Sequence, residues 1–191
     1  NANNLPSYTV NKNTTVTLNA NYKDLSVKKG ANVTVNGSLF RKVTIEEGAT
    51  VKFTSAVVNI EDLSVGKGSS SLTRVRFGGN TSIRIKDRVR IEGNAIINQD
   101  NYQVTFYFSA ASGCGEGDED KFSVKGGNTT VVANVLIPNG KIKVENEGDD
   151  DDDCHGNNNG GTSVYMTGLY VGNTVKGDGK NIYWNTYSCT A

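Results

Sequence analysis

Residues 25–53 read LSVKKGANVTVNGSLFRKVTIEEGATVKF and contain the same short unit twice. Each copy, at 25–35 and at 43–53, joins an apolar-x-apolar triplet to a glycine corner and a second alternating segment. Glycine suits the corner, at Gly30 and Gly48, because it accepts a positive φ without steric cost. Strand side chains alternate between faces, so each triplet directs two side chains inward and one towards water.

The triplet recurs along almost the whole chain, at intervals of 18 to 22 residues. A period of this length is typical of a solenoid that adds one turn per repeat. A third copy of the full unit has its glycine at Gly68 and a longer corner before Val75. The nine triplets begin at Leu25, Val43, Leu63, Ile83, Val104, Phe122, Ile142, Val164 and Ile182.

A third apolar patch closes each coil, so the sequence predicts an all-β, single-stranded parallel β-helix with three short strands per coil. About nine or ten coils, with strands about 4.8 Å apart, would form a rod on the order of 45 Å long. We expect almost no helix. The alternative is a β-sandwich, whose strands would not repeat a three-strand unit in phase. The third patch comprises Leu39, Val57 with Val58, Ile96 with Ile97, and Val135 with Ile137.

The repeat leaves no gap for a domain boundary, so we expect one domain over 1–191. Residues 1–22 form an N-terminal strand segment, in which Tyr8–Val10 or Val16–Leu18 supplies the first coil. Two acidic insertions, 113–120 and 145–161, interrupt later coils. No apolar run approaches the roughly 20 residues that span a bilayer. A start at Asn1 without a leader segment fits a mature secreted product or a trimmed chain.

The net charge is zero, but its distribution is uneven. Residues 1–100 contain 14 Lys or Arg and 8 Asp or Glu, whereas residues 101–191 contain 6 and 12. In a rod whose axis follows the sequence, this predicts a basic end and an acidic end. Such ends would attract each other between subunits. The alternative is a solvated exterior with uneven charge.

Three cysteines, Cys114, Cys154 and Cys189, allow one disulfide. Cys114 and Cys154 lie in the two acidic insertions, 40 residues or two coil lengths apart. Loops that leave the same corner two coils apart could meet, so we predict a Cys114–Cys154 bridge and an oxidising compartment. The alternative is three free thiols.

The second insertion contains five consecutive aspartates, which repel one another and would gain stability from a divalent cation. Calcium suits this set because it takes six to eight oxygen ligands in a flexible shell. Two hypotheses stay open, a calcium site and an acidic loop without a ligand. The candidate ligands are Asp149, Asp150, Asp151, Asp152 and Asp153, with Asp118 and Asp120 from the first insertion.

Catalytic residues are not expected. The single histidine, His155, lies in the acidic insertion, and carboxylates gather in loops rather than in pairs along a groove. Outward basic residues in the middle coils instead predict a stripe that holds an anionic polysaccharide or an acidic neighbour. The alternative is an ordinary solvated surface. Nucleic acid is disfavoured because no stacking aromatics are interleaved. The stripe comprises Arg74, Arg76, Arg84, Lys86, Arg88 and Arg90.

Residues 128–144, with Pro138-Asn-Gly140, and residues 164–175, with Gly168 and Gly172, resemble the PNG-motif solenoids of bacterial cell-surface and pilus-associated proteins. The earlier coils, with their Lys-Lys-Gly-Ala and Glu-Glu-Gly-Ala corners, resemble the polymer-forming β-helix of bactofilins. The resemblance implies a bacterial extracellular or envelope protein that builds structure. The acidic, cysteine-bearing insertions depart from bactofilins, which are cytoplasmic.

A β-helix exposes unpaired backbone groups on its first and last coils unless a cap covers them. Both termini of this chain have strand-like sequences. We therefore expect a secreted structural subunit of an extracellular bacterial fibre, which assembles head to tail. The alternatives are a C-terminal β-helical module of a surface adhesin, a carbohydrate-binding module and a polysaccharide lyase.

Overall fold

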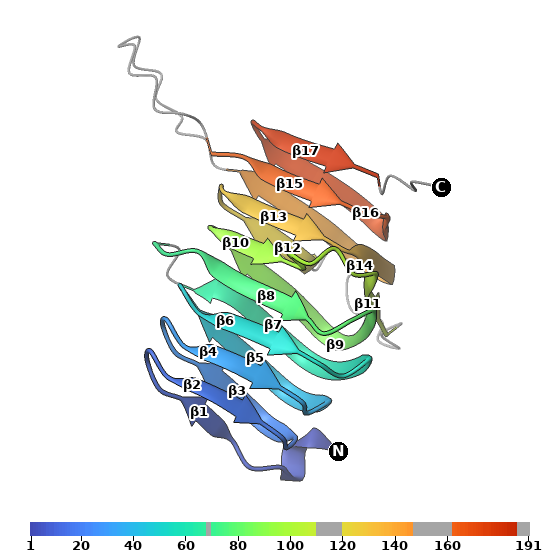
Figure 1. The fold of residues 1–191 in the computed structure, drawn as a ribbon. Coiled ribbons are helices and arrows are strands. Elements are labelled where there is room, and N and C mark those ends of the chain that lie inside the picture. Colours follow the sequence, from blue (N-terminus) through green and yellow to red (C-terminus); the bar gives the residue numbers. More distant parts are fainter. Residues whose placement is uncertain (68–69, 110–119, 147–161, 187–191) are drawn as a thin grey trace.

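The computed structural model describes residues 1–67, 70–109, 120–146 and 162–186. It is a parallel β-helix, as the repeat predicts. All paired strands run parallel, and they stack along one axis from β1 and β2 at one end to β16 and β17 at the other (Figure 1). The only helix in the described residues is the short 3-10 helix η1 (Ala2–Asn4).

The first sheet contains nine strands in the described residues. β11 and β12 together occupy one level of it, because β11 pairs with the first half of β9 and β12 with the second half. Its strands are β1 (Tyr8–Val10), β3 (Tyr22–Val27), β5 (Leu39–Glu46), β7 (Val57–Lys67), β9 (Thr81–Glu92), β11 (Val104–Phe108), β12 (Asp120–Lys125), β14 (Asn134–Asn146) and β16 (Tyr170–Gly179).

The second sheet contains one strand per turn, eight in the described residues, so nine or ten coils stay a prediction. Both segments proposed for the first coil are strands, one in each sheet. The second sheet comprises β2 (Thr15–Leu18), β4 (Asn32–Val35), β6 (Thr50–Phe53), β8 (Thr73–Phe77), β10 (Ala95–Ile97), β13 (Thr129–Val132), β15 (Val164–Thr167) and β17 (Ile182–Asn185).

The long strands of the first sheet bend, which divides this sheet into two arms. In β7, Val58 and Ile60 are buried, the register shifts between Ile60 and Asp62, and burial resumes at Leu63. We call the part before this shift the first arm and the part after it the second arm. With the second sheet, the two arms give three faces per turn.

The nine triplets do not lie on one face of the solenoid. The expectation that each triplet occupies the same position in its coil is therefore wrong. Those that begin at Leu25, Val43, Leu63, Phe122 and Ile142 lie in one column of the second arm, where Val89 also lies. The triplets at Ile83 and Val104 lie on the first arm, and those at Val164 and Ile182 belong to the second sheet. Ile96 and Ile97 likewise lie in β10 of the second sheet. Turns of unequal length cause these offsets.

The corner between the second arm and the second sheet uses left-handed residues. Gly30 has φ +70° and Gly48 has φ +69°, as their place in the repeat predicts. Any residue other than glycine at either position would have a strained backbone conformation. Gly68 lies outside the described residues, but nearby Gly66 has φ +82°. Asparagine takes the same role in the first turn, where Asn13 has φ +55°.

Candidate functional site

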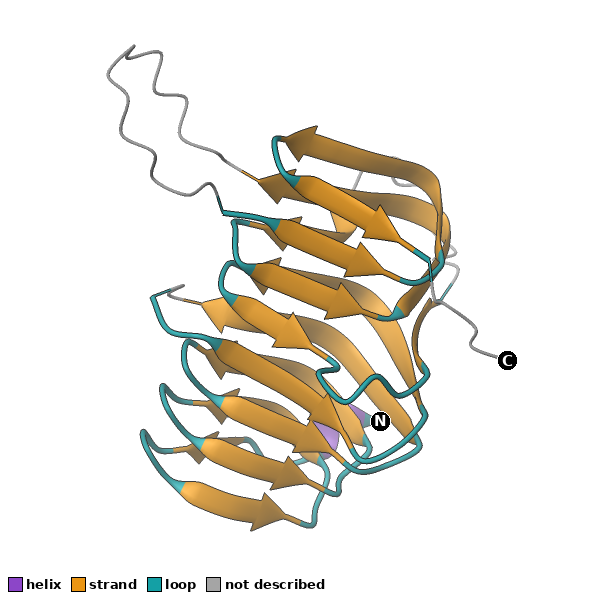
Figure 2. Cartoon of the chain, turned by 45° about the horizontal axis from the view of Figure 1, so that its top comes forward, coloured by secondary structure: helices purple, strands orange, loops and turns teal. Residues whose placement is uncertain are grey.

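The hydrophobic core opens to solvent at the last turn of the solenoid. Val175 of β16 continues the column of Ile142, and Trp184 of β17 continues the column of Met166. Ile142 and Met166 are 0% exposed, whereas Val175 is 45% and Trp184 42% exposed. The last turn lies at one end of the stack (Figure 2). Within the described residues, its inward side therefore presents apolar surface to water.

Small residues and one aromatic contact shape this open surface. Gly172 lies opposite Ile137 and Gly177 opposite Val144, so two inward positions of β16 carry no side chain. Trp184 lies edge-on to Tyr170, with ring centroids 5.2 Å apart at an angle of 80°. The aromatic pair joins the last strands of the two sheets, while the glycines leave room beside it.

One edge of β17 has no partner among the described strands. The carbonyls of Asn181 and Asn185 accept hydrogen bonds from Val164 and Gly168. Successive residues of a strand direct their backbone polar groups to opposite sides. The N–H and C=O groups of Ile182 and Trp184 therefore point away from β15, towards the edge where another strand could pair.

The first turn has a matching edge. The carbonyls of Thr14 and Leu18 accept hydrogen bonds from Asn32 and Asn36 of the next turn. The N–H and C=O groups of Thr15 and Thr17 consequently point to the open side of β2. The neighbouring strand β1 places Tyr8, which is 41% exposed, at the head of the column that continues through Leu25.

The short helix η1 lies beside the stack rather than across its end. It contacts β3 and β5. Its residues line a groove together with Asn59 of β7 and Arg84 of β9, the next two strands along the axis. The edges of β1 and β2 thus stay uncovered by η1.

The described residues test only part of the predicted charge difference between the ends. Nine of the twelve acidic residues in the second half of the chain lie outside the described residues, all of them within the two insertions. The described part of that half contains six basic residues against three acidic ones, so its described residues do not form an acidic end. The basic residues are Lys121, Lys125, Lys141, Lys143, Lys176 and Lys180, and the acidic ones are Asp120, Glu145 and Asp178.

The two insertions leave different corners. Residues 110–119 separate β11 of the first arm from β12 of the second arm, whereas residues 147–161 separate β14 from β15 of the second sheet. The premise that both loops share a corner two coils apart is therefore wrong. Cys114, Cys154 and Cys189 themselves lie outside the described residues, and the Cys114–Cys154 disulfide stays a prediction.

Most candidate calcium ligands also lie outside the described residues, namely Asp118 and Asp149–Asp153. The described candidate, Asp120, has its Oδ1 atom 3.3 Å from Nζ of Lys141. In the part of the chain that the structure describes, no cluster of three or more His, Cys, Asp or Glu could hold a metal. The described residues also include no helix long and apolar enough to cross a bilayer.

The six basic residues expected in one stripe lie on three faces. Arg74 and Arg76 belong to β8 of the second sheet, Arg84 and Lys86 lie on the first arm, and Arg88 and Arg90 lie on the second arm. The prediction treated alternate residues as one face, but β9 bends between Lys86 and Arg88. A single continuous stripe is therefore wrong.

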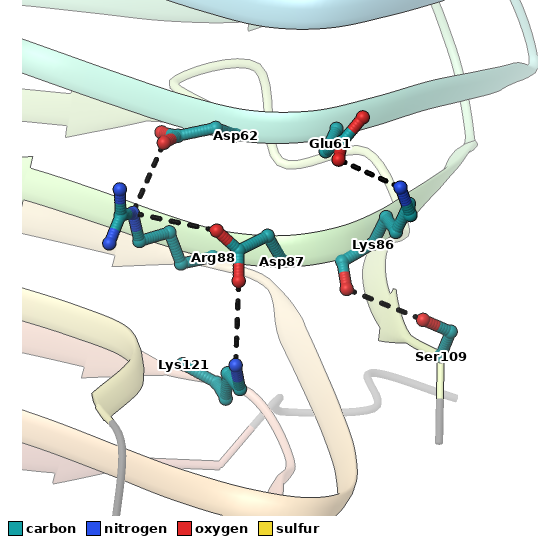
Figure 3. Close-up of polar contacts among 7 residues, drawn as sticks. All are labelled: Glu61, Asp62, Lys86, Asp87, Arg88, Ser109 and Lys121. Carbon is teal, nitrogen blue, oxygen red and sulfur yellow. Dashed lines mark hydrogen bonds and ion pairs between the residues drawn. The ribbon is translucent and has the colours of Figure 1, made fainter. Parts of the chain in front are cut away.

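Ion pairs neutralise three of these six. Arg76 binds Asp100 through two hydrogen bonds of 2.9 and 2.7 Å, and this contact lowers the pKa of the Asp100 carboxyl. Lys86 lies 2.8 Å from Glu61, and Arg88 lies 3.1 Å from Asp62 (Figure 3). Among the described residues, Arg74, Arg84 and Arg90 have no ion pair.

Comparisons of the chain with protein-family models, curated proteins and solved structures find no match. Among the described strands of the second sheet, β2 and β17 are the two that have a neighbour on one side only.

Proposed function

We propose that this chain is a secreted structural subunit of an extracellular bacterial fibre, which grows head to tail by extending both sheets from one copy into the next. The observation that carries the proposal is the last turn, where half-exposed Val175 and Trp184 accompany a free strand edge. Apolar surface beside unpaired backbone groups is a template for strand addition.

Continuing the observed register pairs the two ends residue by residue. If the columns of the second sheet continue from β17 into β2 of the next copy, Trp184 lies opposite Val16 and Ile182 lies opposite Thr14. In the first sheet, Val175 lies opposite Tyr8 of the next copy. Apolar positions meet in both sheets, so the junction would extend the core.

The parallel strands give the contact a direction. One end always presents β16 and β17 and the other β1 and β2, so the contact is heterologous. A heterologous contact along a nearly straight stack does not close on itself, and subunit addition then produces a fibre.

Sedimentation velocity over a series of protein concentrations, followed by negative-stain electron microscopy, tests the proposal. We expect the weight-average size to rise with concentration and unbranched filaments to form. A discrete particle of constant size at every concentration would contradict head-to-tail assembly and would favour the alternative of an adhesin module.

Secretion rests on the resemblance to cell-surface solenoids and on the predicted disulfide. Mass spectrometry of unreduced native protein should find Cys114 joined to Cys154. Free thiols at both positions would remove this support for an oxidising compartment, without affecting the assembly argument.

A further inference from the structure

A groove of about 740 Å³ lies on the outer face of the first arm. Its floor carries one outward side chain from each of four successive strands, in register: Leu39, Asn59, Arg84 and Tyr107. Neighbouring positions are about 4.8 Å apart, so the groove runs along the solenoid axis. Its volume is within the range of pockets that bind small ligands.

Within the described part of the chain, Arg84 is the unpaired cationic side chain of this groove. The other cationic side chain in the lining, Lys86, lies 2.8 Å from Glu61 (Figure 3), which also lines the groove. Arg84 is exposed and has no ion pair among the described residues. A guanidinium can donate two parallel hydrogen bonds to a carboxylate or a sulfate, so a ligand anion would complete its pairing.

The neighbouring side chains suit a hydroxylated ligand with apolar ring faces. Asn59 donates through Nδ2 to the carbonyl of Ser38 at 3.2 Å, which fixes its amide and leaves Oδ1 as an acceptor. Tyr107 is 43% exposed and offers both a flat ring and a hydroxyl. These groups accompany the Arg84 cation on adjacent strands.

A peptide is less suited to this groove. The floor strands β5, β7, β9 and β11 are each paired on both sides, so no backbone edge is available for strand addition. Recognition must use side chains that repeat once per strand. We propose that the groove binds an anionic oligosaccharide, with Arg84 on an acidic substituent and Tyr107 against a sugar ring.

Titration calorimetry with a short oligouronate, a sulfated oligosaccharide and a neutral oligosaccharide of equal length tests the proposal. The native chain should bind at least one of the anionic ligands and should bind the neutral one more weakly. Comparison of the first two ligands distinguishes a carboxylate from a sulfate. Arg84→Gln should weaken binding by about tenfold or more, as expected for loss of a charge-assisted contact. Addition of Tyr107→Leu to this variant should weaken oligosaccharide binding further.

Arg90→Gln is the matched control, because Arg90 is an exposed, unpaired arginine of the same strand but lies on the second arm, outside the groove. It should leave the affinity unchanged, and both variants should retain native unfolding curves. Three results would overturn the proposal: no binding of either anionic oligosaccharide, equal losses in Arg84→Gln and Arg90→Gln, or equally tight binding of a polyglutamate peptide. The groove lies on the side of the stack, so these outcomes do not depend on fibre formation.

Discussion

Trp184 meets Tyr170 edge to face at 5.2 Å, and this contact joins the two sheets at the last turn. One turn earlier the equivalent of Trp184 is Met166, which is fully buried. Trp184 is half-exposed because no described strand follows β17. An aromatic residue left in this position is the expected anchor of an interface, since large aromatic side chains dominate interface energetics.

Thr17→Pro should block addition at the first turn while preserving the monomer. The Thr17 N–H points to the open edge of β2, so its loss breaks no ladder bond within the chain. A copy approaching along this edge would lose one hydrogen bond and meet the proline ring. We expect the association constant to fall by at least about tenfold in sedimentation equilibrium.

Thr17→Val is the control for that experiment, because it keeps the N–H and the branched shape. It should assemble as the native chain does, and both variants should have native circular dichroism spectra. Equal assembly of the proline variant would show that β2 is not the growing edge.

Trp184→Lys should abolish assembly from the other end. The substitution places a charge in an inward position that an incoming copy would bury, and inward charges are a known protection of sheet edges. Tyr183→Lys is the matched control, since Tyr183 is 46% exposed on the same strand but points outward. Electron microscopy should find filaments of the Tyr183 variant and none of the Trp184 variant. Filaments of both would exclude the proposed interface.

Phe122→Ala should destabilise the middle of the stack. Phe122 is 0% exposed and contacts Phe106 and Phe108, with centroid distances of 5.7 and 6.5 Å. Removal of a buried phenylalanine costs about 3–5 kcal/mol, the sum of lost transfer energy and a cavity. Urea unfolding should measure this loss, whereas exposed Tyr107→Ala should cost far less. Similar losses for the two would mean that the column through Phe122 is not the core.

Glu47→Gln should remove a pH-dependent contribution to stability. Hydrogen bonds from Lys29 and then Ser70 lower the pKa of the Glu47 carboxyl from 4.5 to about 2. Because the folded pKa lies below the unfolded value, the carboxylate stabilises the fold above pH 4.5 and loses this effect as the pH falls towards 2. The stability difference between native and variant chains should therefore shrink over this range. A difference independent of pH would contradict the contact.

The repeat in the sequence was sufficient to predict the solenoid and its glycine corners, because alternation and positive φ are local properties. It did not predict which face each strand occupies. Leu63 pairs with Val89 rather than with the next triplet at Ile83, because the corner after Leu63 is longer. A uniform spacing along the chain cannot reveal unequal corners.

The basic stripe failed for the same reason, since the bend in β9 separates Arg84 from Arg88. The open end was expected from strand-like termini, but its composition was not. In the sequence, the triplet at Ile182 looks like the buried ones before it. Exposure of Trp184 depends on what lies beyond the last turn, which is a property of the stack rather than of local sequence.

The axial repeat of the filament tests end-to-end continuation most directly. Each subunit contributes eight described strands to the second sheet, so strands about 4.8 Å apart give an axial rise of about 38 Å per subunit. Cryo-electron microscopy of assembled protein should find this rise, with the 4.8 Å strand spacing unbroken across each junction. Filaments whose subunits meet side by side, or whose strand spacing is interrupted at every junction, would contradict the account.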